Sequence, residues 1–317
     1  MIGLIPNALA AHAAFAAYLP QIAQLDSALL EAVVAVEPVV GWAPRARQGS
    51  AKHAIQQHKI TAGTGGPPDA ALFGSCATIL TPTLSNGETG QVRQIVPSLV
   101  SPPARALSAI DFERRVVERN ELVVRPGSLH DLLNALVWLT FPKTKRAISE
   151  AHVALGVNAD GVPRRGAAPH RRPRRRDVLT VFDESGMIVV SERGDLREMN
   201  RTHQWRELFV THRGDFIEQA RPVLFGHGSM EQLGNQLPRV HPGLTVKALW
   251  LPLPVATPLA ELDDYLSRRI QRGESLHDTE RTVPMPVLGI PGWFAANEVP
   301  ACYDDASVFR PKRRYVK

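Results

Sequence analysis

Two stretches of this chain predict most of its fold: SLHDLLNALVWLTFPKTKRAISEAH at residues 128–152 and RRRDVLTVFDESG at residues 174–186. Apolar residues recur in both at the spacing of regular secondary structure. Between them stand many ionisable or amide side chains, namely His130, Asp131, Asn134, Lys143, Lys145, His152, Asp177, Asp183 and Glu184. Such a concentration of polar groups on ordered elements is typical of a binding or catalytic site.

The first stretch predicts a helix over residues 129–141, with Ser128 as its N-cap, and a second helix from Pro142 to residue 153. At about 100° per residue, one side of the first helix carries Leu132, Leu133, Leu136 and Leu139, and this side should face the core. The opposite side carries His130, Asp131, Asn134, Trp138 and Phe141. Because this side is both polar and aromatic, we expect it to contact another element or a ligand.

Two interpretations of this polar side remain open. In the structural one, Asp131 caps the helix, His130 is a hydrogen-bonded core histidine and Asn134 fixes a loop. In the functional one, these three residues and Lys145 carry a catalytic role. Lys143 and Lys145 could bind phosphate or be solvated.

The second stretch predicts a β-hairpin, in which DVLTVF and MIVVS are the strands and residues 183–186 the turn. Alternation then places Asp177 and Asp183 on one strand face, with Glu184 adjacent. Three such carboxylates could hold a divalent cation through oxygen ligands. The alternative is that Asp-Glu-Ser-Gly has no role beyond forming the turn.

A further candidate, His227, lies in GHGS at 226–229, between a predicted strand at 221–226 and a predicted helix at 227–237. The serine nucleophile pattern G-x-S-x-G fails here, because Met230 and Glu231 follow Ser229. Phosphate-loop, dinucleotide-binding and HExxH signatures are absent from the sequence.

The remaining pattern predicts an α+β fold of helices and short antiparallel hairpins around one main core. We expect an alanine-rich helical leader at 1–59, an irregular Gly/Pro/Ser/Thr-rich connection at 60–106 and a main domain at 107–317. Within that domain, helices are predicted at 205–219 and 258–273, and a strand at 246–253. A basic loop spans 156–176, and loops are predicted from Pro284 onward.

The net charge of +6 is concentrated in the basic loop, because seven arginines fall within residues 164–176. Arg171, Arg172, Arg174 and Arg175 are therefore expected to bind nucleic acid or another polyanion, or an acidic partner, without sequence preference. The rest of the chain is close to neutral, which argues against a basic face over a whole domain.

The sequence predicts a cytoplasmic protein without membrane association. The apolar segment near the N-terminus is too short to span a bilayer and has no signal-peptide layout. The two cysteines, Cys76 and Cys302, lie far apart, which disfavours a cysteine zinc site or a disulfide framework.

The ordered motifs LHDLLNALVWLTFPKTK, RDVLTVFDESG, LFGHGSMEQL, VKALWLPLP and PVLGIPGWFAANEVPACYDDASVFRP resemble a bacterial family catalogued as domain of unknown function 3025. The resemblance covers roughly residues 107–311, whereas residues 1–106 match poorly. It implies a soluble bacterial protein but no particular activity. The resemblance also implies a set of residues that members of the family share, namely His130, Asp131, Asn134, Trp138, Asp177, Asp183, Glu184 and His227.

Two functions of different class are compatible with these observations. The first is a metal-dependent hydrolase of phosphoesters or phosphodiesters, in which the polar helix side and the acidic cluster hold a divalent cation that activates water. The second is a non-catalytic binding or scaffolding protein whose basic loop contacts nucleic acid or an acidic partner.

Overall fold

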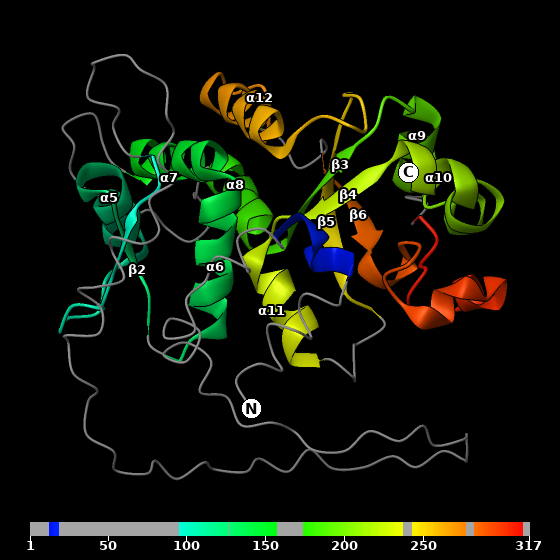
Figure 1. The fold of residues 1–317 in the computed structure, drawn as a ribbon, viewed down its shortest axis with the longest axis horizontal. Coiled ribbons are helices and arrows are strands. Elements are labelled where there is room, and N and C mark those ends of the chain that lie inside the picture. The colour runs from blue at the N-terminus through cyan, green and yellow to red at the C-terminus, as the bar shows by residue number, and fades with distance from the viewer. Residues whose placement is uncertain are drawn as a thin grey trace, which may run out of the picture.

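A mixed four-stranded sheet lies beside a group of packed helices and defines an α+β fold (Figure 1). The computed structural model describes residues 13–18, 95–125, 127–156, 174–236, 243–276 and 282–312. Its longer helices are α5 (Ala109–Arg119), α6 (Leu129–Thr140), α7 (Pro142–Gly156), α8 (Arg174–Ser185), α9 (Gly194–Arg201), α10 (Arg213–Gln219), α11 (His227–Gln236) and α12 (Leu259–Gln271). The two helices predicted on either side of Pro142 are confirmed as α6 and α7.

The sheet has the strand order β4-β3-β5-β6. Its strands are β3 (Gly186–Val190), β4 (Arg221–Leu224), β5 (Thr245–Leu251) and β6 (Thr282–Pro286). The central strands β3 and β5 are parallel, whereas β4 and β6 run antiparallel to their neighbours. Ile188 of β3 is in register with Val223 of β4 and Leu249 of β5. Every residue of β3 is buried, which accounts for its unbroken apolar run.

The prediction that DVLTVF forms the first strand of a hairpin is wrong, because this segment lies within helix α8. Its buried residues Val178, Leu179 and Phe182 recur at helical spacing. A short apolar run of this kind is compatible with a helix or a strand when only the sequence is considered. The predicted turn is a direct junction from α8 to β3, where any side chain at Gly186 would collide with the main-chain oxygen of Phe182.

The antiparallel strand pairs are joined through helices and not through tight turns. Helices α9 and α10 separate β3 from β4, and α12 separates β5 from β6. Four elements match the prediction from the sequence, namely β4, α11, β5 and α12. The helix predicted at 205–219 corresponds mostly to a π-helical turn at Glu207–Thr211 followed by α10. The tail is not loop throughout, since residues 284–286 belong to β6 and several 3₁₀ turns follow.

Helix α6 is buried on two sides. Leu132, Leu133 and Leu136 pack in the main core, as the leucine spacing predicts. Ala135 and Trp138 pack in a second, smaller core with Val116 of α5, Leu122 of β2 (Glu121–Val123) and Val124. A helix between two apolar layers is expected to be apolar almost all round, and this explains Trp138 on its second side. Phe141, expected on the same side, packs in the main core instead.

Part of the N-terminal segment packs on the main domain. Residues Ala13–Tyr18 form a 3₁₀ turn, and the buried hydroxyl of Tyr18 donates a hydrogen bond to the carbonyl of Leu224 at 2.6 Å. Strand β1 (Ser98–Val100), within the segment predicted as irregular, pairs in parallel with β2. The rest of the predicted leader helices and residues 60–94 lie outside the described residues.

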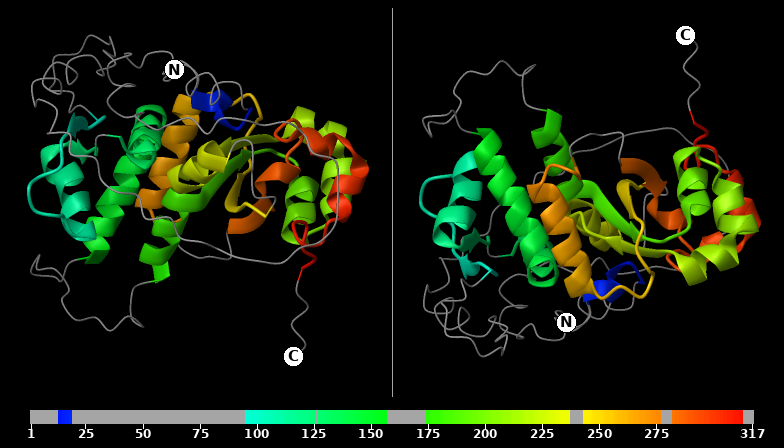
Figure 2. Two further views of the ribbon diagram at one scale, coloured as in Figure 1. Left: turned by 90° about the horizontal axis from the view of Figure 1, so that it is seen from below. Right: turned by 90° about the horizontal axis from the view of Figure 1, so that it is seen from above.

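Helix α7 is the central element of the helical part, because it packs against α5, α6, α8 and α12 (Figures 1 and 2). Helix α11 packs against both α6 and α8. The sheet lies between this helical group and the C-terminal 3₁₀ turns (Figure 2). In the part of the chain that the structure describes, every helix is too short or too polar to cross a membrane.

Candidate metal centre

Two histidines from different helices meet where α6 and α11 pack together. His130 lies in the first turn of α6, and His227 is the first residue of α11. Their ring centroids are 4.5 Å apart, with the rings inclined at 70°. The approach depends on Gly226, where a side chain would collide with the backbone of Ser185 and Gly186. The glycine thus allows the start of α11 to lie against the end of α8.

Carboxylates from α8 and α11 complete this cluster. Oε1 of Glu184, in the last turn of α8, lies 3.6 Å from Nε2 of His227. Oε2 of Glu231 lies 2.9 Å from Nδ1 of His130. A side chain at Gly228 would occupy the position of the Glu184 carboxylate, so a second glycine of the GHGS segment makes room for an acidic group.

His130, Glu184 and His227 can together hold a metal ion. One candidate ligand atom from each residue lies within 4.8 Å of the others, and His227 is buried. Two imidazoles and one carboxylate suit zinc or another first-row transition metal, whereas magnesium and calcium favour oxygen ligands. The sequence predicted a cation site made of the carboxylates of Asp177, Asp183 and Glu184. Of these three residues, only Glu184 belongs to the candidate ligands that the structure brings together.

The electrostatics of the cluster favour a neutral His227. Burial lowers the pKa of His227 to about 4, although the carboxylate of Asp183 acts in the opposite direction. Its Nδ1 is buried without a hydrogen-bond partner among the described residues. Burial also raises the pKa of Glu184, in part offset by His130. A neutral imidazole has a lone pair to offer, which is the form that binds a metal.

A buried ion pair adjoins the cluster. Nζ of Lys145, on α7, lies 2.5 Å from Oδ1 of Asp183 on α8, and also 5.7 Å from the centroid of the Trp138 ring. Burial acts to raise the pKa of Asp183, but the charge and the hydrogen bond of Lys145 outweigh it and hold this pKa below its usual value. Because the side chain of Lys145 is buried and paired with Asp183, it is not accessible to a phosphate group, as the hypothesis of phosphate binding by Lys145 requires.

Glu113 and Ser149 belong to the same polar region but did not stand out in the sequence. Burial raises the pKa of Glu113, on α5, to about 7, while a hydrogen bond with Ser149 of α7 acts to lower it. Asp183 and Lys145 act on Glu113 as well, the first raising its pKa and the second lowering it. A single glutamate in an amphipathic helix carries no sequence signal of this kind, so only the packing of α5 on α7 reveals it.

Three predicted site residues, Asp131, Lys143 and Asp177, do not belong to the cluster. Asp131 accepts hydrogen bonds from the backbone and side chain of Arg125, at 2.7 to 2.9 Å, so it closes the loop before α6. Lys143 pairs with Asp264 of α12. Asp177 lies in the first turn of α8, almost two turns before Asp183, and the two do not share a strand face.

Asn134 follows His130 by one helical turn on α6. Its Oδ1 atom is buried and has no hydrogen-bond partner among the described residues. A buried, unpartnered amide oxygen costs free energy unless a water or ligand satisfies it. Asn134 therefore remains a candidate for the site. The structural interpretation, in which Asn134 fixes a loop, is not supported by a hydrogen bond to Oδ1 among the described residues.

The arginines expected to bind a polyanion are only partly described. Arg171 and Arg172, and the side chain of Arg174, lie outside the described residues. Arg175 donates a hydrogen bond to the carbonyl of Ile270 at 2.7 Å, near the end of α12. This guanidinium caps a helix, a role that does not require nucleic acid.

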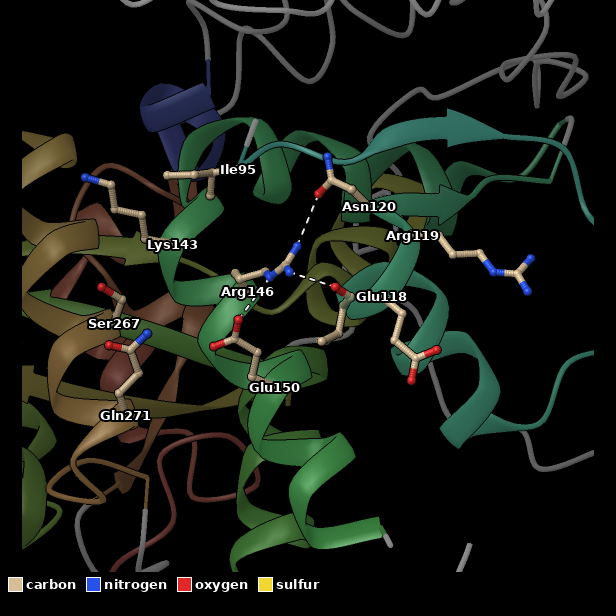
Figure 3. A pocket seen from close by; sticks show the side chains of 10 residues that line it. Ile95, Glu118, Arg119, Asn120, Lys143, Arg146, Glu150, Ser267 and Gln271 are labelled. Carbon is tan, nitrogen blue, oxygen red and sulfur yellow. Dashed lines mark hydrogen bonds and ion pairs between the residues drawn. The ribbon is translucent and has the colours of Figure 1, made fainter. Parts of the chain in front are cut away.

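A separate pocket of about 520 Å³ lies on another side of α7 (Figure 3). Arg146 stands in it, bonded to the carbonyl of Val117 at 2.7 Å, to Asn120 at 3.2 Å and to Glu150 at 3.1 Å. These bonds fasten α7 to the end of α5. Because each nitrogen of the guanidinium already has a partner in the protein, we assign the pocket no ligand.

A cluster of two histidines and a glutamate beside a buried Lys–Asp pair, within an α+β fold, defines a protein with a candidate metal centre. Residues 99–313 match the model of the family described as protein of unknown function (DUF3025). The match covers more than half of the chain, so the protein belongs to this family, as the motifs predicted. No curated protein and no solved structure matches the chain.

Proposed function

We propose that this protein is a metal-dependent hydrolase that acts on phosphoesters or phosphodiesters. The observation that carries the proposal is the convergence of His130, Glu184 and His227, from three helices, on one small volume. Three protein ligands are the usual number at catalytic zinc centres, where a water molecule takes a further position. The net charge of +6, which comes mainly from the arginines of residues 164–176, attracts anionic substrates to the protein over long range.

A bound divalent metal ion would lower the pKa of a water molecule and polarise the phosphoryl oxygen. The protein's own contribution is to hold the ligands. His227 is fixed at the start of α11 by the close contact of Gly226 with the α8–β3 junction, and Glu184 is fixed in the last turn of α8. The nearby Lys145–Asp183 pair packs α7 against α8 and thereby supports Glu184.

The test combines metal analysis with a hydrolysis assay. Purified protein should contain close to one equivalent of zinc or a related metal and should hydrolyse bis(4-nitrophenyl) phosphate or 4-nitrophenyl phosphate. His227→Ala and Glu184→Ala should each lose both properties. His212→Ala is the matched control, since His212 also pairs with a carboxylate, Asp215 at 2.9 Å, but lies outside the cluster. Wild-type protein that binds no transition metal would contradict the proposal.

We also propose that the protein acts in the cytoplasm. Its Cys302 is a free, half-buried thiol, which fits a reducing compartment. Fractionation of cells that express the protein at its native level tests this proposal, and recovery in an oxidising compartment would contradict it.

A further inference from the structure

Glu231 has a different relation to the metal centre from that of Glu184. It lies on α11 four residues after His227, so the two side chains emerge on the same side of that helix. Its carboxylate does not approach His227 but crosses to α6 and accepts a hydrogen bond from Nδ1 of His130 at 2.9 Å. Helix α11 therefore supplies one candidate ligand, His227, and holds a second, His130, although His130 and Glu231 are 101 positions apart.

This contact determines which nitrogen of His130 can bind a metal. A carboxylate at Nδ1 requires a proton on that nitrogen, and a neutral imidazole then carries its lone pair on Nε2. Metal-binding histidines commonly donate their second N–H to a carboxylate, which orients the ring and increases the basicity of the ligand nitrogen. His130, a member of the cluster with Glu184 and His227, has such a carboxylate, that of Glu231, at its Nδ1.

We infer that Glu231 is a positioning residue for the metal centre: it fixes the tautomer and orientation of His130 so that Nε2 faces the metal. This inference rests on the proposed function. A purely structural His130–Glu231 pair is the alternative, but both side chains are about one-third exposed, at 29% and 33%. A pair this exposed contributes little to stability. The two roles therefore differ in what they predict for metal affinity.

The experiment measures zinc affinity, the visible spectrum of the cobalt-substituted protein and the melting temperature of the metal-free protein. Glu231→Ala should weaken zinc binding by about 10- to 100-fold and alter the cobalt spectrum. Glu231→Gln keeps an acceptor oxygen but loses the charge, so its affinity should fall between those of the wild type and the alanine variant. Both variants should melt within a few degrees of the wild type in the metal-free form.

The matched control is Asp215→Asn, because Asp215 contacts Nδ1 of His212 at the same 2.9 Å outside the cluster. Its zinc affinity should equal that of the wild type. If wild type binds zinc and cobalt but both Glu231 variants bind them equally well, the positioning role is overturned and the proposed function stands. If the wild type binds neither metal, the proposed function fails, and the inference fails with it.

Discussion

Lys145 and Asp183 form an ion pair in which the amine and the carboxylate oxygen are 2.5 Å apart and only 4% of the lysine side chain is exposed. The pair joins the first turn of α7 to the last turn of α8, the turn that also carries Glu184. It therefore connects the packing of the helical group to the geometry of the candidate metal centre. The first prediction follows from its burial.

Removing only one member of this pair should be costly, because the other charge then stays buried without a partner. We expect Asp183→Asn to lower the free energy of unfolding by about 3 kcal/mol. The double variant Lys145→Met/Asp183→Asn, compared with Lys145→Met and Asp183→Asn alone, should recover most of this loss, because neither charge then remains buried without a partner. Urea unfolding of the wild type, both single variants and the double variant completes a thermodynamic cycle. Additive losses in the double variant would show that the two side chains do not interact.

Glu113 should make stability decrease with rising pH. Its pKa is raised to about 7 in the folded protein, so the fold favours the protonated carboxyl. This contribution is complete below the ordinary pKa of glutamate and is lost as pH rises through 7. Glu113→Gln, which stays neutral, should therefore be more stable than the wild type at pH 8, by up to roughly 3 kcal/mol, and similar to it at pH 4.5.

Thermal or urea unfolding of both proteins at the two pH values checks this. Glu118→Gln serves as the control, since Glu118 is exposed on the same helix. An equal difference between wild type and Glu113→Gln at both pH values would contradict the assignment.

Gly226 should tolerate no side chain. A Cβ atom there would collide with the backbone of Ser185 and Gly186, and backbone cannot move aside as a flexible side chain can. We expect Gly226→Ala to cost about 3 kcal/mol of stability and to weaken zinc binding, because it displaces His227. Gly194→Ala is the matched control, with open space around the new methyl group. Similar melting temperatures for the two variants would disprove the close contact.

Tyr18 should be essential to the stability of the main domain. Its side chain is fully buried, its hydroxyl bonds the carbonyl of Leu224, and its ring packs edge-on against Phe141. Tyr18→Ala should cost about 3–5 kcal/mol, and Tyr18→Phe about 1–3 kcal/mol, since it leaves a buried carbonyl unpaired. Ala16→Ser, at an exposed position of the same turn, should have little effect. Melting curves that are unchanged by Tyr18→Ala would show that the segment does not pack there in solution.

The sequence by itself determined the strongly periodic elements and the family. Helices α6, α7 and α12 were predictable because apolar residues at helical spacing and flanking prolines act locally. Strand β3 was predictable because a buried parallel strand is a continuous apolar run. The sequence also singled out His130, Glu184 and His227 individually, since polar groups stand out beside such elements.

Only the tertiary structure decided how these residues combine. The sequence grouped Glu184 with its neighbours Asp177 and Asp183, whereas the fold turns DVLTVF into a helix and brings Glu184 to two histidines on other helices. It also assigns Glu231 to His130 and brings Glu113 to the Lys145–Asp183 pair. The physical reason is that periodicity reports which side of an element is buried, while the partner of that side depends on packing between segments far apart in the chain.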